Sequence, residues 1–289
     1  MKRTAMLGFV LVLTACVQWF TGGFPVSFFA FPLNVLLTAA WVLWLGVAYR
    51  RPDRPAWVRY LLSPHATAAS LTLFALCCLV TGLFAQLPEG QPARGAAARL
   101  GLHSFTTSWP FVFCFLFLFT HLTLVLFRGW QTKRRCKWRF RLVHLGLWTA
   151  LFCGFIGSSD ALTTYAMVSR DKAERRTFSA ERQIHYAPYT LRLKDFRVES
   201  YPDGMPRQYR AQVEIDGKST EIAVNHPCSP RFGEHIYLSS YDMQKGEDTG
   251  YIMVQIVRQP WQYGTLAGIV MLLAGTLLLF VQGAERREI

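Results

Sequence analysis

Long apolar runs separated by short basic loops make up most of this chain, and one polar segment interrupts them. Crossing the hydrocarbon layer of a bilayer takes about 20 apolar residues. Six runs approach that length: residues 4–22, 27–48, 66–86, 108–127, 142–159 and 262–282. Lys2 and Arg3 precede the first run, as in a secretory signal, but Phe24-Pro25 leads directly into the second run. The pattern therefore predicts six spans, the first two forming a retained helical hairpin.

The polar segment carries the two-residue period of β-strands. About five strands are expected, at residues 191–198, 209–215, 220–224, 235–241 and 251–257. This number predicts a small all-β domain, either a sandwich or an open barrel. Residues 165–185 are charged and weakly patterned, which favours a surface helix or linker before the first strand.

Two turns and one bulge are expected in this domain. Asp216-Gly217 is the dipeptide best suited to a two-residue hairpin turn, and the sequence YPDG at 201–204 is a second turn signal. Leu191 and Leu193 lie in one phase of the alternation, whereas Phe196 and Val198 lie in the other. A bulge near residues 194–195 would return them to one buried face.

The expected fold is an integral membrane α-helical protein with a small extracytoplasmic all-β domain. Four parts are expected along the chain: a two-helix hairpin (1–50), a three-helix membrane core (60–160), the β domain with its helical linker (161–260) and a C-terminal transmembrane helix (261–289).

The net charge of +13 does not indicate nucleic-acid binding. Residues 160–260 hold fourteen basic and fourteen acidic side chains, and the basic excess lies in short loops near residues 2–3, 50–59 and 128–141. Short loops rich in Lys and Arg remain cytoplasmic. With six spans, these loops and both termini fall on the cytoplasmic side of a bacterial inner membrane, and the β domain falls outside it.

Cysteine usage and motif content exclude several kinds of chemistry. Cys228 is the one cysteine of the β domain, Cys136 lies in a basic loop, and the others lie in apolar runs. The sequence contains no CxxC, which argues against a thiol–disulfide carrier, and no CxxCH, so the chain is not itself a c-type cytochrome. No HExxH, Gly-rich phosphate loop or Ser/His/Asp arrangement indicates a self-contained hydrolase.

The histidines are the remaining candidates, because imidazole is the usual protein ligand of haem iron. His144 lies one turn inside the fifth span, where an ionisable residue indicates function, although an interfacial or interhelical role is an equal alternative. For His121, deeper in the fourth span, an interhelical hydrogen bond is the stronger reading. His103 is expected at the external interface, and His226 and His235 make only a weak metal site.

Several segments resemble the ResB (CcsB) family of cytochrome c biogenesis proteins. They are LKDFRVE at 193–199, YPDG at 201–204, AVNHP at 223–227, IY at 236–237 and SSYD at 239–242, together with His103-Ser104 before Trp109 and HLGL at 144–147. The resemblance covers about residues 100–283. The chain departs from the family pattern in having a single Trp109 followed by Pro110 and in having Leu238 where Gln is common.

The resemblance implies a non-autonomous subunit of a cytochrome c haem lyase of the system II pathway. There a CcsA-type partner with a Trp-rich WWD motif moves haem outward and attaches it to CxxCH apocytochromes. No WGxxWxWD-like segment occurs here. Carried over by position, His144 is the expected ligand of haem iron in transit, His103 and His121 are further haem-binding candidates, and Arg141, with Arg135 and Arg139, would attract haem propionates. The alternatives are a scaffold that binds no haem, or a solute-binding sensor or transporter subunit.

Overall fold

The structure is a computed structural model that describes residues 2–87, 91, 94–131, 137–203 and 205–282. The chain divides into two compact units. The helical unit comprises residues 1–159 and 263–289, and the sheet unit comprises residues 160–262.

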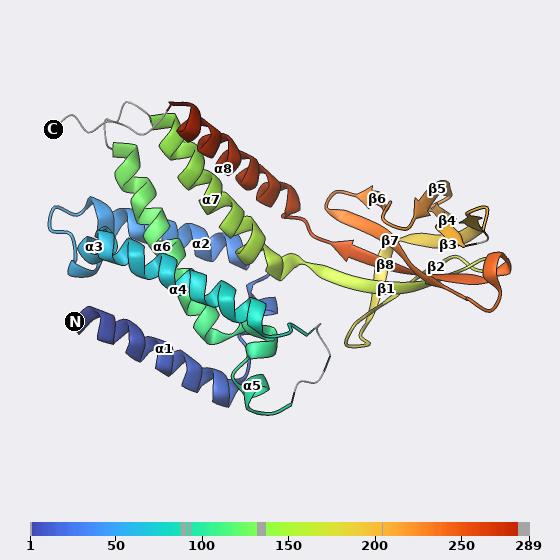
Figure 1. Ribbon diagram of the computed structural model, residues 1–289, viewed down its shortest axis with the longest axis horizontal. Coiled ribbons are helices and arrows are strands. Elements are labelled where there is room, and N and C mark those ends of the chain that lie inside the picture. Colours follow the sequence, from blue (N-terminus) through green and yellow to red (C-terminus); the bar gives the residue numbers. More distant parts are fainter. Residues whose placement is uncertain (1, 88–90, 92–93, 132–136, 204, 283–289) are drawn as a thin grey trace. The chain divides into compact units, whose positions relative to one another are not determined.

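Six long helices form the helical unit: α1 (Lys2–Thr21), α2 (Leu33–Arg50), α4 (Pro64–Leu83), α6 (Trp109–Gln131), α7 (Lys137–Phe155) and α8 (Gln262–Gln282) (Figure 1). Short elements connect them: η1 (Val26–Phe29), α3 (Ala56–Leu61), α5 (Ala96–Arg99), η2 (Leu102–Thr107) and η3 (Ile156–Asp160). Helices α2, α4, α6, α7 and α8 are long and apolar enough to cross a membrane. The described apolar part of α1, Met6–Thr21, is shorter, so the sixth span stays a prediction.

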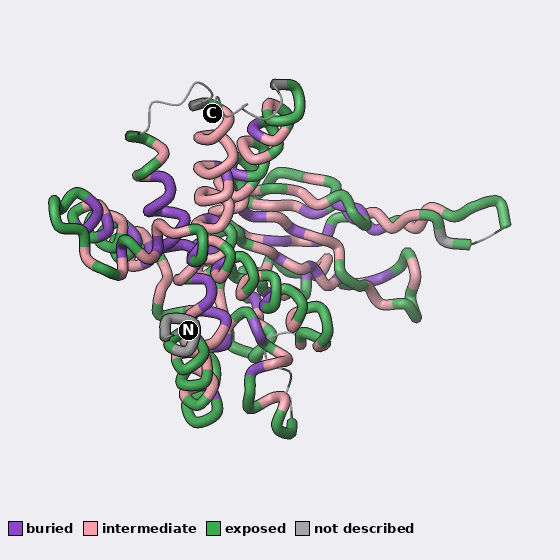
Figure 2. The backbone as a smooth tube through the Cα atoms, turned by 60° about the vertical axis from the view of Figure 1, so that its left-hand side comes forward, coloured by how far each residue is buried: buried purple, intermediate pink, exposed green. Residues whose placement is uncertain are grey.

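Helix α6 is the centre of this unit. It packs against α1, α2, α4 and α7. Of its apolar stretch 67% is buried, against at most 22% in the other four candidate spans. Phe115, Phe119 and Leu124 on α6 are almost completely buried, and Figure 2 shows buried positions continuing along this helix. Any side chain that α6 directs at a neighbour is therefore held within the helical unit.

Helices α7 and α8 pack through glycine. A Cβ atom added to Gly268 would lie 2.5 Å from the backbone nitrogen of Ala150, and one added to Gly146 would lie 2.7 Å from the carbonyl oxygen of Gly268. The two backbones therefore touch, as small residues allow in membrane helix pairs. Helix α8 runs alongside α7 in Figure 1.

The sheet unit is one antiparallel sheet of eight strands in the order β5-β4-β3-β2-β1-β8-β7-β6. The strands are β1 (Leu162–Ser169), β2 (Glu174–Ser179), β3 (Ile184–Ser200), β4 (Pro206–Ile215), β5 (Lys218–Ala223), β6 (Cys228–Arg231), β7 (Glu234–Tyr241) and β8 (Tyr251–Arg258), with the 3₁₀ turn η4 (Gly246–Asp248) before β8. Although β5 and β7 are not paired, they lie near each other, so the sheet curls around its apolar core.

The five predicted strands are present as β3, β4, β5, β7 and β8, but the sheet has three more. The prediction of a helix or linker over residues 165–185 was wrong. Strands β1 and β2 occupy most of that range, and β6 is a further strand. The buried face of β1 is made by Thr164, Ala166 and Val168, and in β2 only Thr177 is buried. Small and polar side chains thus fill inward positions, and this hides the alternation that identifies a strand.

The predicted local features of the sheet are confirmed. Asp216 and Gly217 have φ angles of 46° and 83° and join β4 to β5, with Ile215 paired to Lys218. The register of β3 on β4 shifts between Leu193 and Asp195. Leu191, Leu193 and Phe196 are consequently all buried. Pro202 and Asp203 form a turn, and the Tyr201 N–H donates to the carbonyl of Met205 at 2.8 Å. Gly204, the last residue of the predicted YPDG turn, lies outside the described residues.

Candidate functional site

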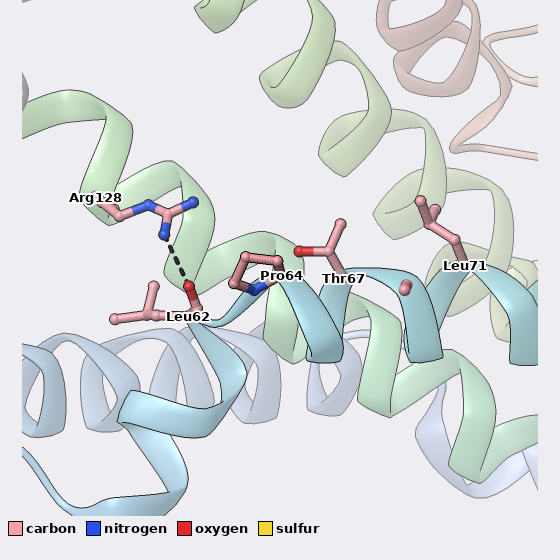
Figure 3. A pocket seen from close by; sticks show the side chains of 6 residues that line it. Leu62, Pro64, Thr67, Leu71 and Arg128 are labelled. Carbon is pink, nitrogen blue, oxygen red and sulfur yellow. Dashed lines mark hydrogen bonds between the residues drawn. The ribbon is translucent and has the colours of Figure 1, made fainter.

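A groove between α4, α6 and α7 brings two of the candidate histidines together. A pocket of about 340 Å³ is lined from α6 by Leu118, His121, Leu122, Val125, Arg128 and Gly129, from α7 by Phe140, His144 and Leu147, and from α4 by Thr67 and Leu71. An adjoining hollow of about 360 Å³ shares Thr67, Leu71 and Arg128 with it (Figure 3). We call the two together the histidine groove.

His121 is buried in the middle of α6, with 5% of its surface exposed. Its Nδ1 atom lies 2.6 Å from the carbonyl oxygen of Leu61, the last residue of α3. A carbonyl oxygen only accepts, so this contact assigns the ring proton to Nδ1 and the lone pair of the neutral ring to Nε2. The interhelical hydrogen bond expected for His121 is therefore present, and it uses only one ring nitrogen.

His144 has the same arrangement on α7. Its Nδ1 atom lies 2.9 Å from the carbonyl oxygen of Phe140, one turn earlier. The ring of Phe140 stacks on the imidazole, with 4.0 Å between ring centroids. A Cβ atom at Gly129 would overlap the Phe140 ring, so the close approach of α6 and α7 at this glycine fixes the orientation of Phe140, and with it that of His144.

The groove thus combines two imidazoles, both of which donate from Nδ1 to a backbone carbonyl. Histidines that bind metals typically make this contact, because it fixes the tautomer and makes the other nitrogen a stronger ligand. An imidazole held in this way can bind a metal ion through Nε2.

Arg128 is a groove residue that the sequence analysis did not single out. One guanidinium nitrogen, Nη1, donates to the carbonyl of Leu62 at 2.8 Å, across the hollow that Figure 3 shows. Arg128 lies two turns after His121 on the same stripe of α6 as Val125. The i, i+4, i+7 spacing of His121, Val125 and Arg128 is the sequence signal that places Arg128 on the same helix face as His121. From its charge alone, Arg128 belongs to the basic loop at 128–141.

Two other predicted site residues lie outside the histidine groove. His103 is in η2, where its Nδ1 atom lies 3.0 Å from the carbonyl oxygen of Ala85. The guanidinium of Arg141 lies 5.3 Å from the ring centroid of Trp130 and 5.7 Å from that of Trp138. It is the residue after Phe140, so it lies near the groove without lining it. Arg135 and Cys136 fall outside the described residues.

The sheet unit holds polar pairs rather than a metal cluster. His235 contacts the hydroxyl of Ser229 and the side-chain amide of Gln262, each at 2.7 Å. The Tyr189 hydroxyl donates to the buried carboxylate of Glu234 at 2.6 Å, and burial and that carboxylate raise the pKa of Tyr189. Among the described residues, no group of three or more His, Cys, Asp or Glu side chains could hold a metal ion.

We expect Cys228 to react slowly with alkylating reagents at neutral pH, because burial raises the pKa of its thiol to about 11. Only the thiolate reacts. At pH 8 its population should be lower by more than about 100-fold than for a thiol with the ordinary pKa near 8.5. The measurement is the rate of iodoacetamide alkylation, followed by mass spectrometry of the Cys228 peptide between pH 7 and pH 11. The same peptide in the unfolded chain is the control, and equal rates in the two states would contradict the expectation.

Comparison with known proteins confirms the expected resemblance over part of the chain. The model of the ResB-like family matches residues 133–254, which include α7 and most of the sheet unit. His144 lies inside that range, whereas His103 and His121 lie outside it. No curated protein matches the chain. Among solved structures, a cytochrome c heme lyase CcmF aligns with a TM-score of 0.38 and 14% identity, over 85% of this chain and 39% of that protein. The chain therefore spans about two fifths of the length of that protein.

Proposed function

Residues 133–254 of this chain are a ResB-like segment, and on that basis we propose that the chain is a membrane subunit of the system II machinery of cytochrome c biogenesis. In this role it helps a CcsA-type partner carry haem across the membrane and attach it to CxxCH apocytochromes. The chain lacks a WWD motif of its own, so it acts as one part of a haem lyase and not as an enzyme by itself.

The observation that carries the proposal is the pairing of His121 and His144 in one groove. Both side chains line the same pocket, and both donate Nδ1–H to a backbone carbonyl, a contact that is typical of metal-binding histidines. Haem is the cargo, and these two nitrogens hold its iron. Neutral imidazole is the form that binds iron.

Charge and shape in the groove suit the rest of a haem molecule. Arg128 supplies a permanent cation for a propionate, because a guanidinium stays protonated in proteins. Phe140 and the leucines of the lining offer apolar contact to the macrocycle. Arg141, held between Trp130 and Trp138, lies just beyond Phe140, where it attracts haem propionates toward the groove from the cytoplasmic side.

The topology follows from the positive-inside pattern of the loops. The groove then opens in the cytoplasmic half of the inner membrane, because His144 is near the start of α7 and His121 is in the later half of α6. The sheet unit lies outside the membrane and serves as the docking element for the partner or the apocytochrome. Haem enters from the cytoplasmic side and is passed outward by exchange of one histidine for a ligand of the partner.

A second candidate is a scaffold that clamps the CcsA-type partner and binds no haem. The bond from His121 to the Leu61 carbonyl favours it, because that contact ties α6 to α3 whether or not iron is present.

Purification of the full chain with and without its partner separates the two candidates. We expect a haem Soret band with the chain alone, and loss of holocytochrome c in a strain that lacks the gene. A Soret band that appears only with the partner favours the scaffold. Normal holocytochrome c in the deletion strain would contradict both candidates and favour a solute sensor or transporter subunit.

A further inference from the structure

A second cavity in the helical unit is separate from the histidine groove. Its volume is about 620 Å³, within the range of small-molecule sites. Its lining comes from the η1 segment, the start of α2, η2, the first half of α6, the end of α7 and η3.

The lining is divided by polarity. Five of the six polar residues lie at or near helix ends: Asn34 is near the start of α2, Thr106 and Thr107 end η2, and Ser158 and Ser159 follow α7. The sixth, Thr38, lies one turn further along α2. Further along α2 and α6 the wall is made of Trp41, Leu116 and other apolar side chains. This gradient matches a molecule with one polar head and an apolar body. No residue of the lining carries a charge, so an anionic head, such as a haem propionate or a fatty-acid carboxylate, finds no partner here.

The polar end of the cavity offers hydrogen-bond acceptors. The Ser158 hydroxyl donates to the Phe155 carbonyl at 2.6 Å, and the Thr107 hydroxyl donates to the Ser104 carbonyl at 2.9 Å. The Ser159 hydroxyl contacts the carbonyls of Phe29 and Ile156, both at 2.8 Å. The Ser159 oxygen also accepts from the side-chain amide of Asn34 at 3.3 Å. Each hydroxyl has a single proton and two lone pairs, so each of the three oxygens keeps at least one lone pair for a further donor. The matching head group is one that donates, such as a neutral hydroxyl.

One wall of the cavity is open to the surroundings of the helices. Leu37, Trp41 and Leu116 line it and are 45%, 40% and 46% exposed. In a membrane these side chains meet lipid, so an occupant reaches the cavity sideways from the bilayer. We propose that this cavity binds a neutral lipid alcohol from the outer leaflet, with its hydroxyl head at Ser158, Ser159 and Thr107 and its chain between α2 and α6.

The test is photolabelling of the full chain in lipid nanodiscs with a monoacylglycerol that carries a diazirine in its acyl chain. Labelled peptides from the cavity walls of α2 and α6 are expected. Excess monoolein should compete, whereas methyl oleate, which has no hydroxyl donor, should compete about tenfold less well, the difference that one hydrogen bond makes. Oleate should also compete poorly, because its carboxylate finds no charged partner in the lining. Equal competition by methyl oleate would overturn the hydroxyl assignment, and uniform labelling of all lipid-facing helices would overturn the site.

A pair of variants tests the location independently of the competitors. Leu116→Trp places a large ring in the cavity and should reduce labelling by about tenfold. Leu43→Trp is the matched control, since Leu43 on α2 is 71% exposed and does not line the cavity. If Leu116→Trp unfolds the chain, the competition by monoolein, methyl oleate and oleate on the unchanged protein still tests the proposal. Haem binding has its own readout, the Soret band. A failure of the proposed function would therefore leave the photolabelling result unchanged. Labelling that vanishes when the CcsA-type partner is added assigns the cavity to the protein interface and overturns the lipid assignment.

Discussion

Replacing either His121 or His144 by alanine is expected to lower the affinity of the purified chain for haem by at least about 100-fold. Partners in the second shell of a metal ligand are alone worth about 10–100-fold in metal affinity, and these variants remove a ligand itself. The remaining imidazole would leave five-coordinate iron, so the Soret band of any retained haem should shift to its high-spin position. Titration of ferric haem into detergent-purified protein, followed by absorbance, measures both effects.

His103→Ala is the matched control, because His103 lies in η2 and contacts Ala85 outside the groove. It should leave the titration unchanged. A His144→Gly variant should regain a six-coordinate spectrum when free imidazole is added, which a general loss of structure would not allow. If the alanine variants of His121 and His144 bind haem as tightly as the parent chain, neither histidine is a ligand. A loss with His144→Ala alone would mean that the second ligand comes from the partner.

Gly268→Leu is expected to destabilise the helical unit by about 3 kcal/mol or more. Overpacking a filled core costs about 1–3 kcal/mol when side chains can adjust. At Gly268 the neighbours are the backbone of Ala150 and the carbonyl of Gly146, which cannot move without separating α7 from α8. Gly268→Ala should give a smaller effect of the same sign. The apparent melting temperature of the purified chain in one detergent ranks the variants.

Gly82→Leu provides the comparison within another apolar helix. Gly82 is in α4, and a Cβ atom there would have no neighbour within 4 Å. Gly82→Leu should therefore not lower the melting temperature, because leucine meets no neighbour there and has a higher helix propensity than glycine. Equal melting temperatures for Gly268→Leu and Gly82→Leu would show that the α7–α8 contact contributes little to stability.

The helices were predictable from the sequence because each apolar run is long and its ends are marked by proline, glycine or basic residues. The hairpin at Asp216-Gly217 and the bulge near Asp195 were predictable for a similar reason, since a few neighbouring residues determine them. Strands β1 and β2 were not, because their burial depends on strands far away in the sequence. Thr164 and Thr177 become inward-facing only when β8 and β3 pair with them.

The histidine groove was predictable only in part. That both histidines lie near one basic loop could be read from the sequence, since His121 precedes this loop and His144 follows it. Their common pocket depends on the rotation of α6 about its axis, and that rotation is set by contacts with α1, α2, α4 and α7 together. The HLGL segment at 144–147 likewise does not reveal from its sequence which neighbouring helix each of its residues contacts. His144 lines the groove while Gly146 contacts α8, so one short motif serves two different neighbours.

The pairing of β1 with β8 has a consequence for how such proteins can diversify. The two strands are paired from Leu162 and Arg258 onward, and the Trp261 indole donates to the Asp160 carboxylate at 2.5 Å. The chain therefore enters and leaves the sheet unit at neighbouring points, just after α7 and just before α8. Insertions or deletions in the loops far from this base would therefore leave the entry and exit points of the chain, and the glycine contacts between α7 and α8, unchanged.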